Sequence, residues 1–215
     1  VGMDVLCYNW MPDEDWQRTS KDLPERGGAK VTAFDLKQAG KGNLTDADGL
    51  PPTRTPAGRL WENLKRFLDE ILPTAEDCKI RLAIHPDDPP LANLHGQDRI
   101  ITSNEAFEKV VSLAPSPYNG LCYCQGALAP AGVDVEAGIR KLAPHIQYAH
   151  FRNVSGTADH FRETFHDNGD LDMAALMRAY KESGFNGPMR PDHAPSLAGE
   201  PNETPGYETL GKLHA

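Results

Sequence analysis

The sequence has no long basic run and no long apolar run, and each absence excludes a class of partner. Among its 215 residues, 22 Lys and Arg stand against 31 Asp and Glu, a net charge of −9, and no basic run exceeds two residues. A surface that tracks phosphates needs clustered cations, so nucleic acid is not expected as a partner. No apolar stretch approaches the roughly 18 residues of a membrane span, and the first residues do not resemble a signal peptide. We therefore expect no membrane partner and a cytoplasmic location.

Cysteine is scarce, and the common cofactor motifs are missing. Four cysteines occur and no two of them form a Cys-x-x-Cys motif, at Cys7, Cys78, Cys122 and Cys124. Such a set is too small for a disulfide scaffold at this length and does not suggest a zinc knuckle, so reduced thiols are predicted. No Gly-x-Gly-x-x-Gly or Walker motif occurs, so neither a dinucleotide nor a nucleoside triphosphate is implied.

The sequence does contain a regular alternation of strand-like and helix-like segments. Five short runs are typical of strands, at residues 5–10, 80–84, 120–124, 146–151 and 189–192. Between them lie an amphipathic pattern over residues 59–78 and helices that open near the capping residues Thr102, Asp134 and either Asp170 or Asp172. Strict alternation predicts crossover connections and a parallel sheet with helices on one side, which is the α/β class.

One long segment breaks this alternation. Residues 12–58 are polar and rich in Asp, Gly, Thr and Pro, which predicts an irregular excursion with one strand-like run at residues 29–36. The length of the chain predicts a single domain over residues 1–215.

The ends of the predicted strands carry residues that bear chemistry. In parallel α/β folds, functional groups gather where the strands end and the following loops begin. Four successive strands end on side chains that bind transition metals, at His85, Cys124, His150 and Asp192. Packing alone rarely produces four such residue types in succession, so we predict that they share one divalent metal ion. Cys122 points to the same side of its strand as Cys124, but the strand-end position favours Cys124.

Two further pairs keep two interpretations each. Asp87 and Asp88 stand among prolines and either accept hydrogen bonds that orient the ring of His85 or form an Asp-Pro turn. Glu163 and His166 are three residues apart, so they lie either on one helical turn that faces the site or on a solvated turn.

Several strings of residues together match a known pattern. The most specific are His85-Pro86-Asp87-Asp88-Pro89-Pro90 and Arg190-Pro191-Asp192-His193. Others are Cys7-Tyr8-Asn9-Trp10-Met11-Pro12, Gly58-Arg59-Leu60-Trp61-Glu62-Asn63-Leu64, His150-Phe151-Arg152-Asn153-Val154 and Gly169-Asp170-Leu171-Asp172-Met173. Almost from end to end, the sequence resembles the D-mannonate dehydratase family. The resemblance implies a TIM barrel of the xylose-isomerase-like kind and the conversion of D-mannonate to 2-keto-3-deoxy-D-gluconate in hexuronate catabolism.

The resemblance also implies a metal and its ligands. The ion is usually Mn²⁺ in that family, and its ligands here would be the four residues at the strand ends, His85, Cys124, His150 and Asp192. Ligand softness alone suits Fe²⁺ or Zn²⁺ at least as well.

The implied reaction needs catalysis both for removal of the C2 proton and for departure of the 3-hydroxyl group. The C2 proton of an aldonate is weakly acidic and the 3-hydroxyl is a poor leaving group, so a proton-transfer pair must flank C2 and C3 beside the metal. By position in the chain, His193 and Tyr207 are the predicted pair, with acid and base not assigned between them. Arg190 and Asn9 are predicted to anchor substrate oxygens.

The matching region begins at what would be the fourth barrel strand. We therefore expect the first three βα units to be absent and the fold to be a partial TIM barrel, since five strands do not close an eight-stranded barrel. Either a partner, such as a second copy in a homo-oligomer, covers the open edges, or a further part of the native protein does so. Two other functions stay open, a metal-dependent sugar isomerase or epimerase of the same superfamily and an inactive metal-binding fragment.

Overall fold

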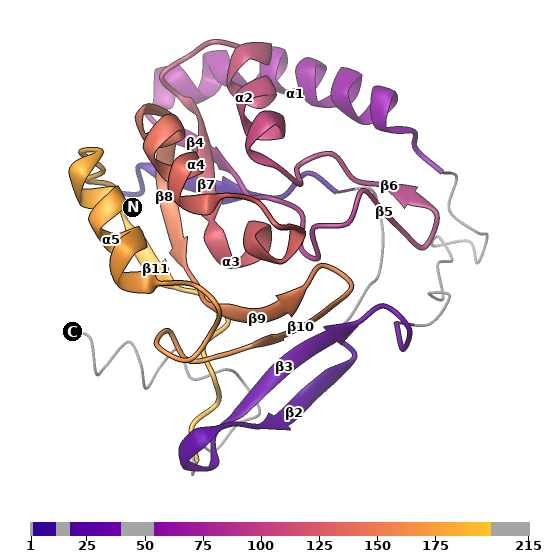
Figure 1. The fold of residues 1–215 in the computed structure, drawn as a ribbon. Coiled ribbons are helices and arrows are strands. Elements are labelled where there is room, and N and C mark those ends of the chain that lie inside the picture. The colour runs from indigo at the N-terminus through magenta and orange to yellow at the C-terminus, as the bar shows by residue number, and fades with distance from the viewer. Residues whose placement is uncertain (1, 12–17, 40–53, 199–215) are drawn as a thin grey trace.

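A curled five-stranded parallel sheet forms the centre of the molecule (Figure 1). The computed structural model describes residues 2–11, 18–39 and 54–198. The sheet has the order β1-β4-β7-β8-β11, and every neighbouring pair is parallel. Its strands are β1 (Val5–Tyr8), β4 (Arg81–Ile84), β7 (Asn119–Cys124), β8 (Ile146–Phe151) and β11 (Met189–Pro191). These are the five predicted strands, and the partial TIM-barrel fold is confirmed.

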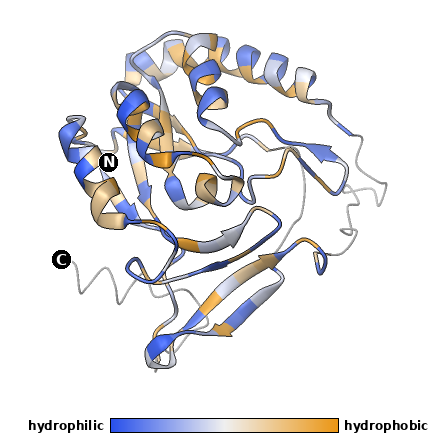
Figure 2. Cartoon of the chain, in the orientation of Figure 1, coloured by the Kyte–Doolittle hydropathy of each residue, from blue (hydrophilic) through white to orange (hydrophobic). Residues whose placement is uncertain are grey.

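Helices link consecutive strands and cover the outer face of the sheet. They are α1 (Ala57–Cys78), α2 (Asn104–Leu113), α4 (Val135–Leu142) and α5 (Met173–Glu182), with the short α3 (Gln125–Leu128) directly after β7. In α1 the residues Leu60, Leu64 and Leu68 recur every fourth position and are buried against the sheet. Figure 2 shows hydrophobic and hydrophilic residues on each of the four longer helices, as amphipathic packing requires.

Side chains alternate between the two faces of the parallel sheet. Leu82 and Ile84 of β4 and Tyr123 of β7 belong to the hydrophobic core beneath the helices. Neighbours along a strand point to opposite faces, so Ala83 and Cys122 lie on the concave face. The residues predicted to bear chemistry at the strand ends share this concave side.

A second, antiparallel sheet lies beside the first (Figure 1) and is only partly predicted by the sequence. Its order is β2-β3-β10-β9, with β2 (Ser20–Pro24), β3 (Lys30–Asp35), β9 (Val154–Thr157) and β10 (His160–Glu163). The strand expected at residues 29–36 is β3, but β2, β9 and β10 are not in the prediction because they are short and mainly polar. Within the predicted excursion at residues 12–58, the described residues 18–39 are therefore less irregular than expected. The sheet has a small core of its own, built on Phe34, Phe161 and Val154.

The helix caps follow the sequence closely, with one correction. Asp134 and Asp172 each accept a hydrogen bond from a backbone N–H in the first turn of their helix, as predicted. The cap of α2 is Ser103 rather than Thr102, since the Ser103 hydroxyl accepts from the backbone N–H of Ala106. The remaining short elements are β5 (Asn93–Leu94), β6 (Gln97–Asp98) and the 3₁₀ turns Arg26–Gly28, Ala129–Ala131 and Ala143–His145.

All four cysteines lie within the described ranges, and the structure forms no disulfide between them. Within those ranges, no helix combines the length and the apolar character that a membrane span requires.

Candidate metal centre

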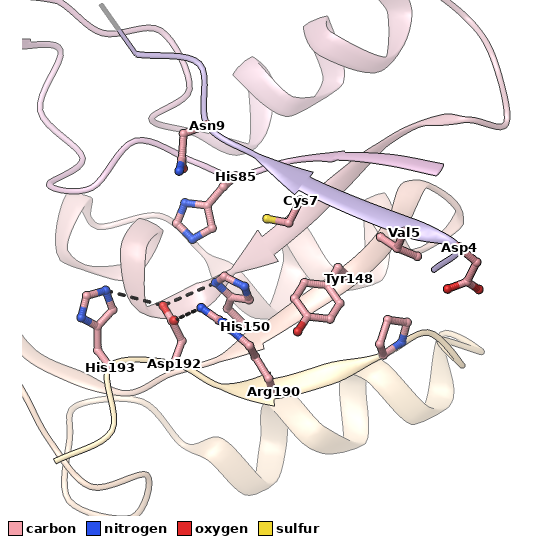
Figure 3. Close-up of a pocket in the computed structure, with 11 residues that line it drawn as sticks. Asp4, Val5, Cys7, Asn9, His85, Tyr148, His150, Arg190, Asp192 and His193 are labelled. Atoms are coloured by element: carbon pink, nitrogen blue, oxygen red, sulfur yellow. Dashed lines mark hydrogen bonds and ion pairs between the residues drawn. The ribbon is translucent and has the colours of Figure 1, made fainter. Parts of the chain in front are cut away.

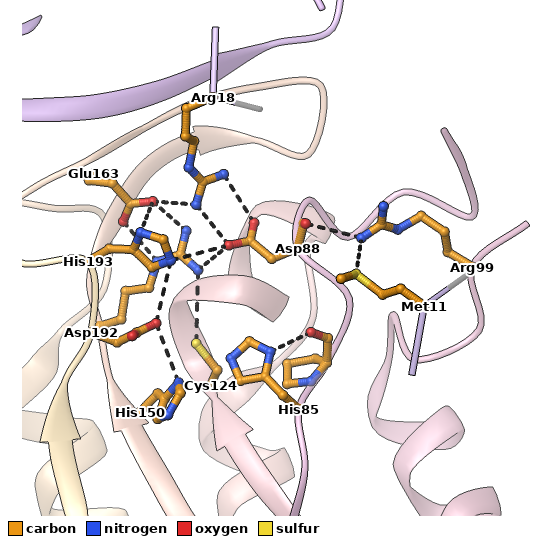
Figure 4. Close-up of polar contacts among 12 residues, drawn as sticks. Met11, Arg18, His85, Asp88, Arg99, Cys124, His150, Glu163, Asp192 and His193 are labelled. Carbon is orange, nitrogen blue, oxygen red and sulfur yellow. Dashed lines mark hydrogen bonds and ion pairs between the residues drawn. The ribbon is translucent and has the colours of Figure 1, made fainter. Parts of the chain in front are cut away.

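Four side chains converge where the parallel strands end (Figure 4). His85 follows β4, Cys124 is the last residue of β7, His150 lies near the end of β8, and Asp192 follows β11. One ligand atom from each lies within 4.8 Å of the other three. We call these residues the four-residue set. The structure therefore brings together the four residues that the sequence predicts as metal ligands.

Local contacts fix the two imidazole rings. The Nδ1 of His85 lies 2.7 Å from the carbonyl oxygen of Pro86, a hydrogen bond that leaves its Nε2 for a ligand. The rings of His85 and His150 stand with centroids 4.8 Å apart. The Nδ1 of His150 lies 3.4 Å from Asp192 Oδ2 (Figure 3), an ion-pair distance, and within the described part of the chain it is a buried nitrogen without a hydrogen bond.

The surroundings favour the metal-binding forms of the thiol and the carboxyl. Burial raises the pKa of Cys124, but interactions with His150 and His85 outweigh burial and bring the pKa down to about 6. Burial also acts to raise the pKa of Asp192, yet His150 holds that pKa well below its usual range. For His150, burial lowers the pKa, while Asp192 and Cys124 raise it to about 11. At neutral pH the set thus presents two anionic ligands beside the imidazolium of His150, which must lose a proton to bind a metal.

A group of five side chains, which we call the charged cluster, borders the four-residue set: Arg18, Asp88, Arg152, Glu163 and His193. Figure 4 labels four of them, Arg18, Asp88, Glu163 and His193. Arg152 is fully buried, and its Nε and Nη2 donate to the two oxygens of Glu163 at 2.8 and 2.6 Å. Its Nη1 lies 2.8 Å from Asp88 Oδ2 and 4.0 Å from Cys124 Sγ. The Nη2 of Arg18 lies 2.8 Å from both Asp88 Oδ2 and Glu163 Oε1. Two guanidinium groups therefore bridge the same two carboxylates.

His193 lies between these carboxylates and the four-residue set. Its Nε2 is 3.8 Å from Asp88 Oδ2 and 3.7 Å from Asp192 Oδ2, and its Nδ1 is 3.8 Å from Glu163 Oε1. Its φ of 49° is in the left-handed region that favours glycine, so the surrounding structure holds the residue in a strained conformation. Burial lowers the pKa of His193 to about 3, and the charge of Arg152 acts in the same direction.

Two interpretations from the sequence are corrected by these contacts. The ring of His85 is oriented by the Pro86 carbonyl, and Asp87 instead accepts hydrogen bonds from the backbone N–H groups of Ile100 and Ile101. Asp88 points into the charged cluster. Glu163 lies in a strand rather than on a helical turn, because β10 pairs with β3 and β9 on its two sides.

Three of the four residues predicted to bind or transform substrate line one cavity. Asn9 and Arg190 line a cavity of 630 Å³ together with His85, His150 and Asp192 (Figure 3). Arg190 also donates to Asp192 Oδ1 at 2.7 Å. His193 lines the same cavity. The second member of the predicted proton-transfer pair, Tyr207, lies outside the described residues.

Sequence reasoning missed two arginines that the structure brings to the site. Arg152 could have been found, because it lies two residues after His150 and so faces the same side of the extending chain. Arg18 carries no such signal, since it is 70 residues from Asp88 and 145 residues from Glu163 along the chain.

The family model and the relatives that match this chain are described as mannonate dehydratases. The family model described as D-mannonate dehydratase (UxuA) matches residues 1–48 and 54–215. A mannonate dehydratase of Streptococcus suis (strain 05ZYH33) is 35% identical over 96% of this chain, and one of Shouchella clausii (strain KSM-K16) is 36% identical over all of it. The chain spans 63% and 68% of the lengths of these two relatives.

The solved structures extend the comparison. The crystal structure of mannonate dehydratase from Streptococcus suis serotype2 matches with a TM-score of 0.85 at 35% identity, over 99% of this chain and 65% of that one. A D-tagatose 3-epimerase-like protein matches with a TM-score of 0.50 at 19% identity, over 64% of this chain and 52% of that one. At that identity, the second match shows the fold alone.

Proposed function

The chain belongs to the D-mannonate dehydratase family, and we propose that it carries the catalytic face for the metal-dependent removal of water from D-mannonate. The product is 2-keto-3-deoxy-D-gluconate, and the reaction is a hydro-lyase step in hexuronate catabolism. The observation that carries the proposal is the convergence of two imidazoles, one thiol and one carboxylate at the strand ends, within 4.8 Å of one another beside the cavity.

The residues of the four-residue set fit a divalent cation. Two anionic and two imidazole ligands are a common donor set for such ions, once His150 has lost its second ring proton. We propose Mn²⁺ as the natural ion, following the family, with Fe²⁺ or Zn²⁺ as alternatives that the thiolate also accepts. When bound, the ion supplies Lewis-acid stabilisation of the charge that develops at the carboxylate and 2-hydroxyl of the substrate.

The side chains that line the cavity bind and orient the sugar acid. Arg190 is proposed to hold a substrate oxygen, since its guanidinium lies at the rim and is already aligned by Asp192. Asn9 faces the same cavity and is proposed to bind a hydroxyl group of the sugar chain. These contacts would align C2 and C3 with the proton-transfer groups, which is where orientation contributes most to the rate.

His193 is proposed to transfer a proton at C2 or at the 3-hydroxyl, with Tyr207 as the other member of the pair. The other members of the charged cluster position this histidine, because Asp88 and Glu163 approach its two ring nitrogens from different sides. Arg18 and Arg152 hold both carboxylates in place. The separations of 3.8 Å are longer than hydrogen bonds, as is common before a substrate tightens a catalytic site.

We also propose a cellular compartment and a partner for this chain. The four free cysteines, one of them a proposed metal ligand, fit a reducing compartment such as the cytoplasm. The strands β1 and β11 each have only one partner within the described sheet, so a second copy of the chain is a proposed partner at these edges. Cell fractionation and light scattering of the purified protein test the two statements.

The experiment that tests the function supplies D-mannonate and Mn²⁺ and follows the product by mass and by its 2-keto group. We expect loss of one water from the substrate, and we expect His193→Ala to abolish turnover while the protein keeps its metal. A product with the mass of the substrate would instead indicate an isomerase or epimerase. Bound metal without any conversion would indicate a metal-binding fragment.

A further inference from the structure

Two cysteines on the concave face of the sheet have no part in the proposed dehydration. Cys7 lies in β1 and Cys122 in β7, and the strand β4 runs between these two. The residue of β4 that pairs with Cys7 is Ala83, whose methyl group lies on the same face as both thiols. A small residue at this position lets the two thiols approach each other across the intervening strand.

His150 completes a group of three around these thiols. The sulfur atoms of Cys7 and Cys122 and one ring nitrogen of His150 all lie within 4.8 Å of one another. Bonds of about 2.3 Å to sulfur and about 2.0 Å to nitrogen place two donors of one tetrahedral ion roughly 3.5–4 Å apart. Small rotations of the side chains therefore suffice to bring all three donors onto a single ion.

The chemistry of this group differs from that of the four-residue set. It has two thiols and no carboxylate, a donor set that suits thiophilic cations such as Zn²⁺ and Cd²⁺ and disfavours Mn²⁺, the weakest binder among the common divalent transition metals. Cys7 is exposed and lines the 630 Å³ cavity together with His150, so an ion in solution can reach the group. Three protein ligands leave a fourth tetrahedral position for water.

We propose that Cys7, Cys122 and His150 form a second cation site, selective for thiophilic ions of the zinc class, which excludes the ion of the four-residue set. The two sites share His150, and one imidazole can serve two cations only after it loses its second ring proton. Occupation of the thiol site therefore removes a ligand from the neighbouring set. The thiol site itself does not depend on the proposed dehydration, whereas the exclusion does involve the proposed metal site.

Titration with Cd²⁺ tests the thiol site directly, through the ultraviolet charge-transfer absorption of cadmium–thiolate bonds. We expect one Cd²⁺ to bind with the intensity of two thiolates in the unmodified protein and in Cys124→Ser, which keeps both thiols of the site. Cys7→Ser, a change at an exposed position, should lose at least half of this intensity. Cys78→Ser removes an exposed thiol outside the group and should change nothing. Full intensity in Cys7→Ser, loss of intensity in Cys124→Ser, or no binding would overturn the site.

Exclusion is tested with Mn²⁺, whose free ion gives an electron paramagnetic resonance signal. Addition of Cd²⁺ to the Mn²⁺-loaded protein should release Mn²⁺, and Cys7→Ser should require at least about tenfold more Cd²⁺ for the same release. Equal release from both proteins would overturn the exclusion. If Mn²⁺ does not bind at all, the proposed metal site fails, while the cadmium absorption of the same variants still decides whether the thiol site exists.

Discussion

The four-residue set and the charged cluster lie in contact but satisfy their charges in different ways. In the charged cluster, two arginines neutralise two carboxylates through bonds of 2.6–2.8 Å, so the group is complete without any further molecule. In the four-residue set, the thiolate and the carboxylate face imidazoles, and the buried Nδ1 of His150 lacks a hydrogen bond. The first arrangement is typical of a scaffold, and the second is typical of a site that receives a cation.

This difference predicts how substitutions in each region should change stability and metal affinity. A self-contained group of buried charges contributes to the folded state directly, and removal of one member leaves its partners buried without compensation. A cation site contributes mainly through the ion that it binds. Changes in the cluster should therefore reduce stability, and changes in the set should reduce metal affinity with less effect on the metal-free fold.

Substitution of Arg152 should break the charged cluster with the largest effect. Arg152→Met preserves most of the volume but leaves Asp88 and Glu163 with Arg18 alone, and the loss of a buried ionic partner costs about 3–5 kcal/mol. Urea denaturation measures the change in the free energy of unfolding. Arg140→Met is the matched control, because Arg140 also bridges two carboxylates but on the surface, and it should cost less than about 1 kcal/mol. Equal losses in the two variants would contradict the scaffold role.

Substitution of His150 should have the opposite pattern. His150→Ala removes one of four ligands, and we expect Mn²⁺ affinity to fall by at least about 100-fold. The metal-free protein should lose less stability than in Arg152→Met, because Asp192 keeps its ion pair with Arg190. Calorimetric titration with Mn²⁺ measures the affinity. The exposed His145 provides the control variant, His145→Ala, which should bind Mn²⁺ like the unmodified protein. Unchanged affinity in His150→Ala would remove this residue from the set.

These two regions also differ in how much of them the sequence predicts. The five parallel strands and the positions of His85 and His150 follow from local patterns, since the end of each strand can be located from the residues of that strand. The charged cluster depends on contacts between distant segments, such as Arg18 with Glu163, 145 residues apart. No local pattern encodes such a pair. The strands β9 and β10 are short and mostly polar, and their stability comes from pairing with β3 rather than from their own periodicity.

Acidification should distinguish Asp88 from a surface carboxylate. Burial raises the pKa of Asp88, but Arg152 and Arg18 outweigh it and hold the pKa well below its usual range. A carboxyl with a lowered pKa in the folded state stabilises the protein above its unfolded pKa of about 3.9, and this contribution is lost as the pH falls below that value. Asp88→Asn should therefore cost about 1.5–3 kcal/mol at neutral pH and progressively less below pH of about 4.

The control for this measurement is Asp69→Asn, which breaks an exposed pair with Lys65. Its cost should stay within about 0.5 kcal/mol across the same pH range. A cost of Asp88→Asn that does not vary with pH would show that the charge of Asp88 does not carry its contribution.

The smallest effect is expected where charge is kept and only geometry changes. Arg18→Lys retains a cation next to Asp88 and Glu163, but an ammonium is a compact charge and cannot reproduce the flat guanidinium that binds both carboxylates. We expect a loss of about 1 kcal/mol in the free energy of unfolding. If the cluster positions His193, the same variant should reduce kcat several-fold and leave KM and metal content almost unchanged. Arg26→Lys, in an exposed ion pair of the same hairpin, should alter neither the free energy of unfolding nor kcat. A rise in KM without a fall in kcat would assign Arg18 to substrate binding instead of to the alignment of His193.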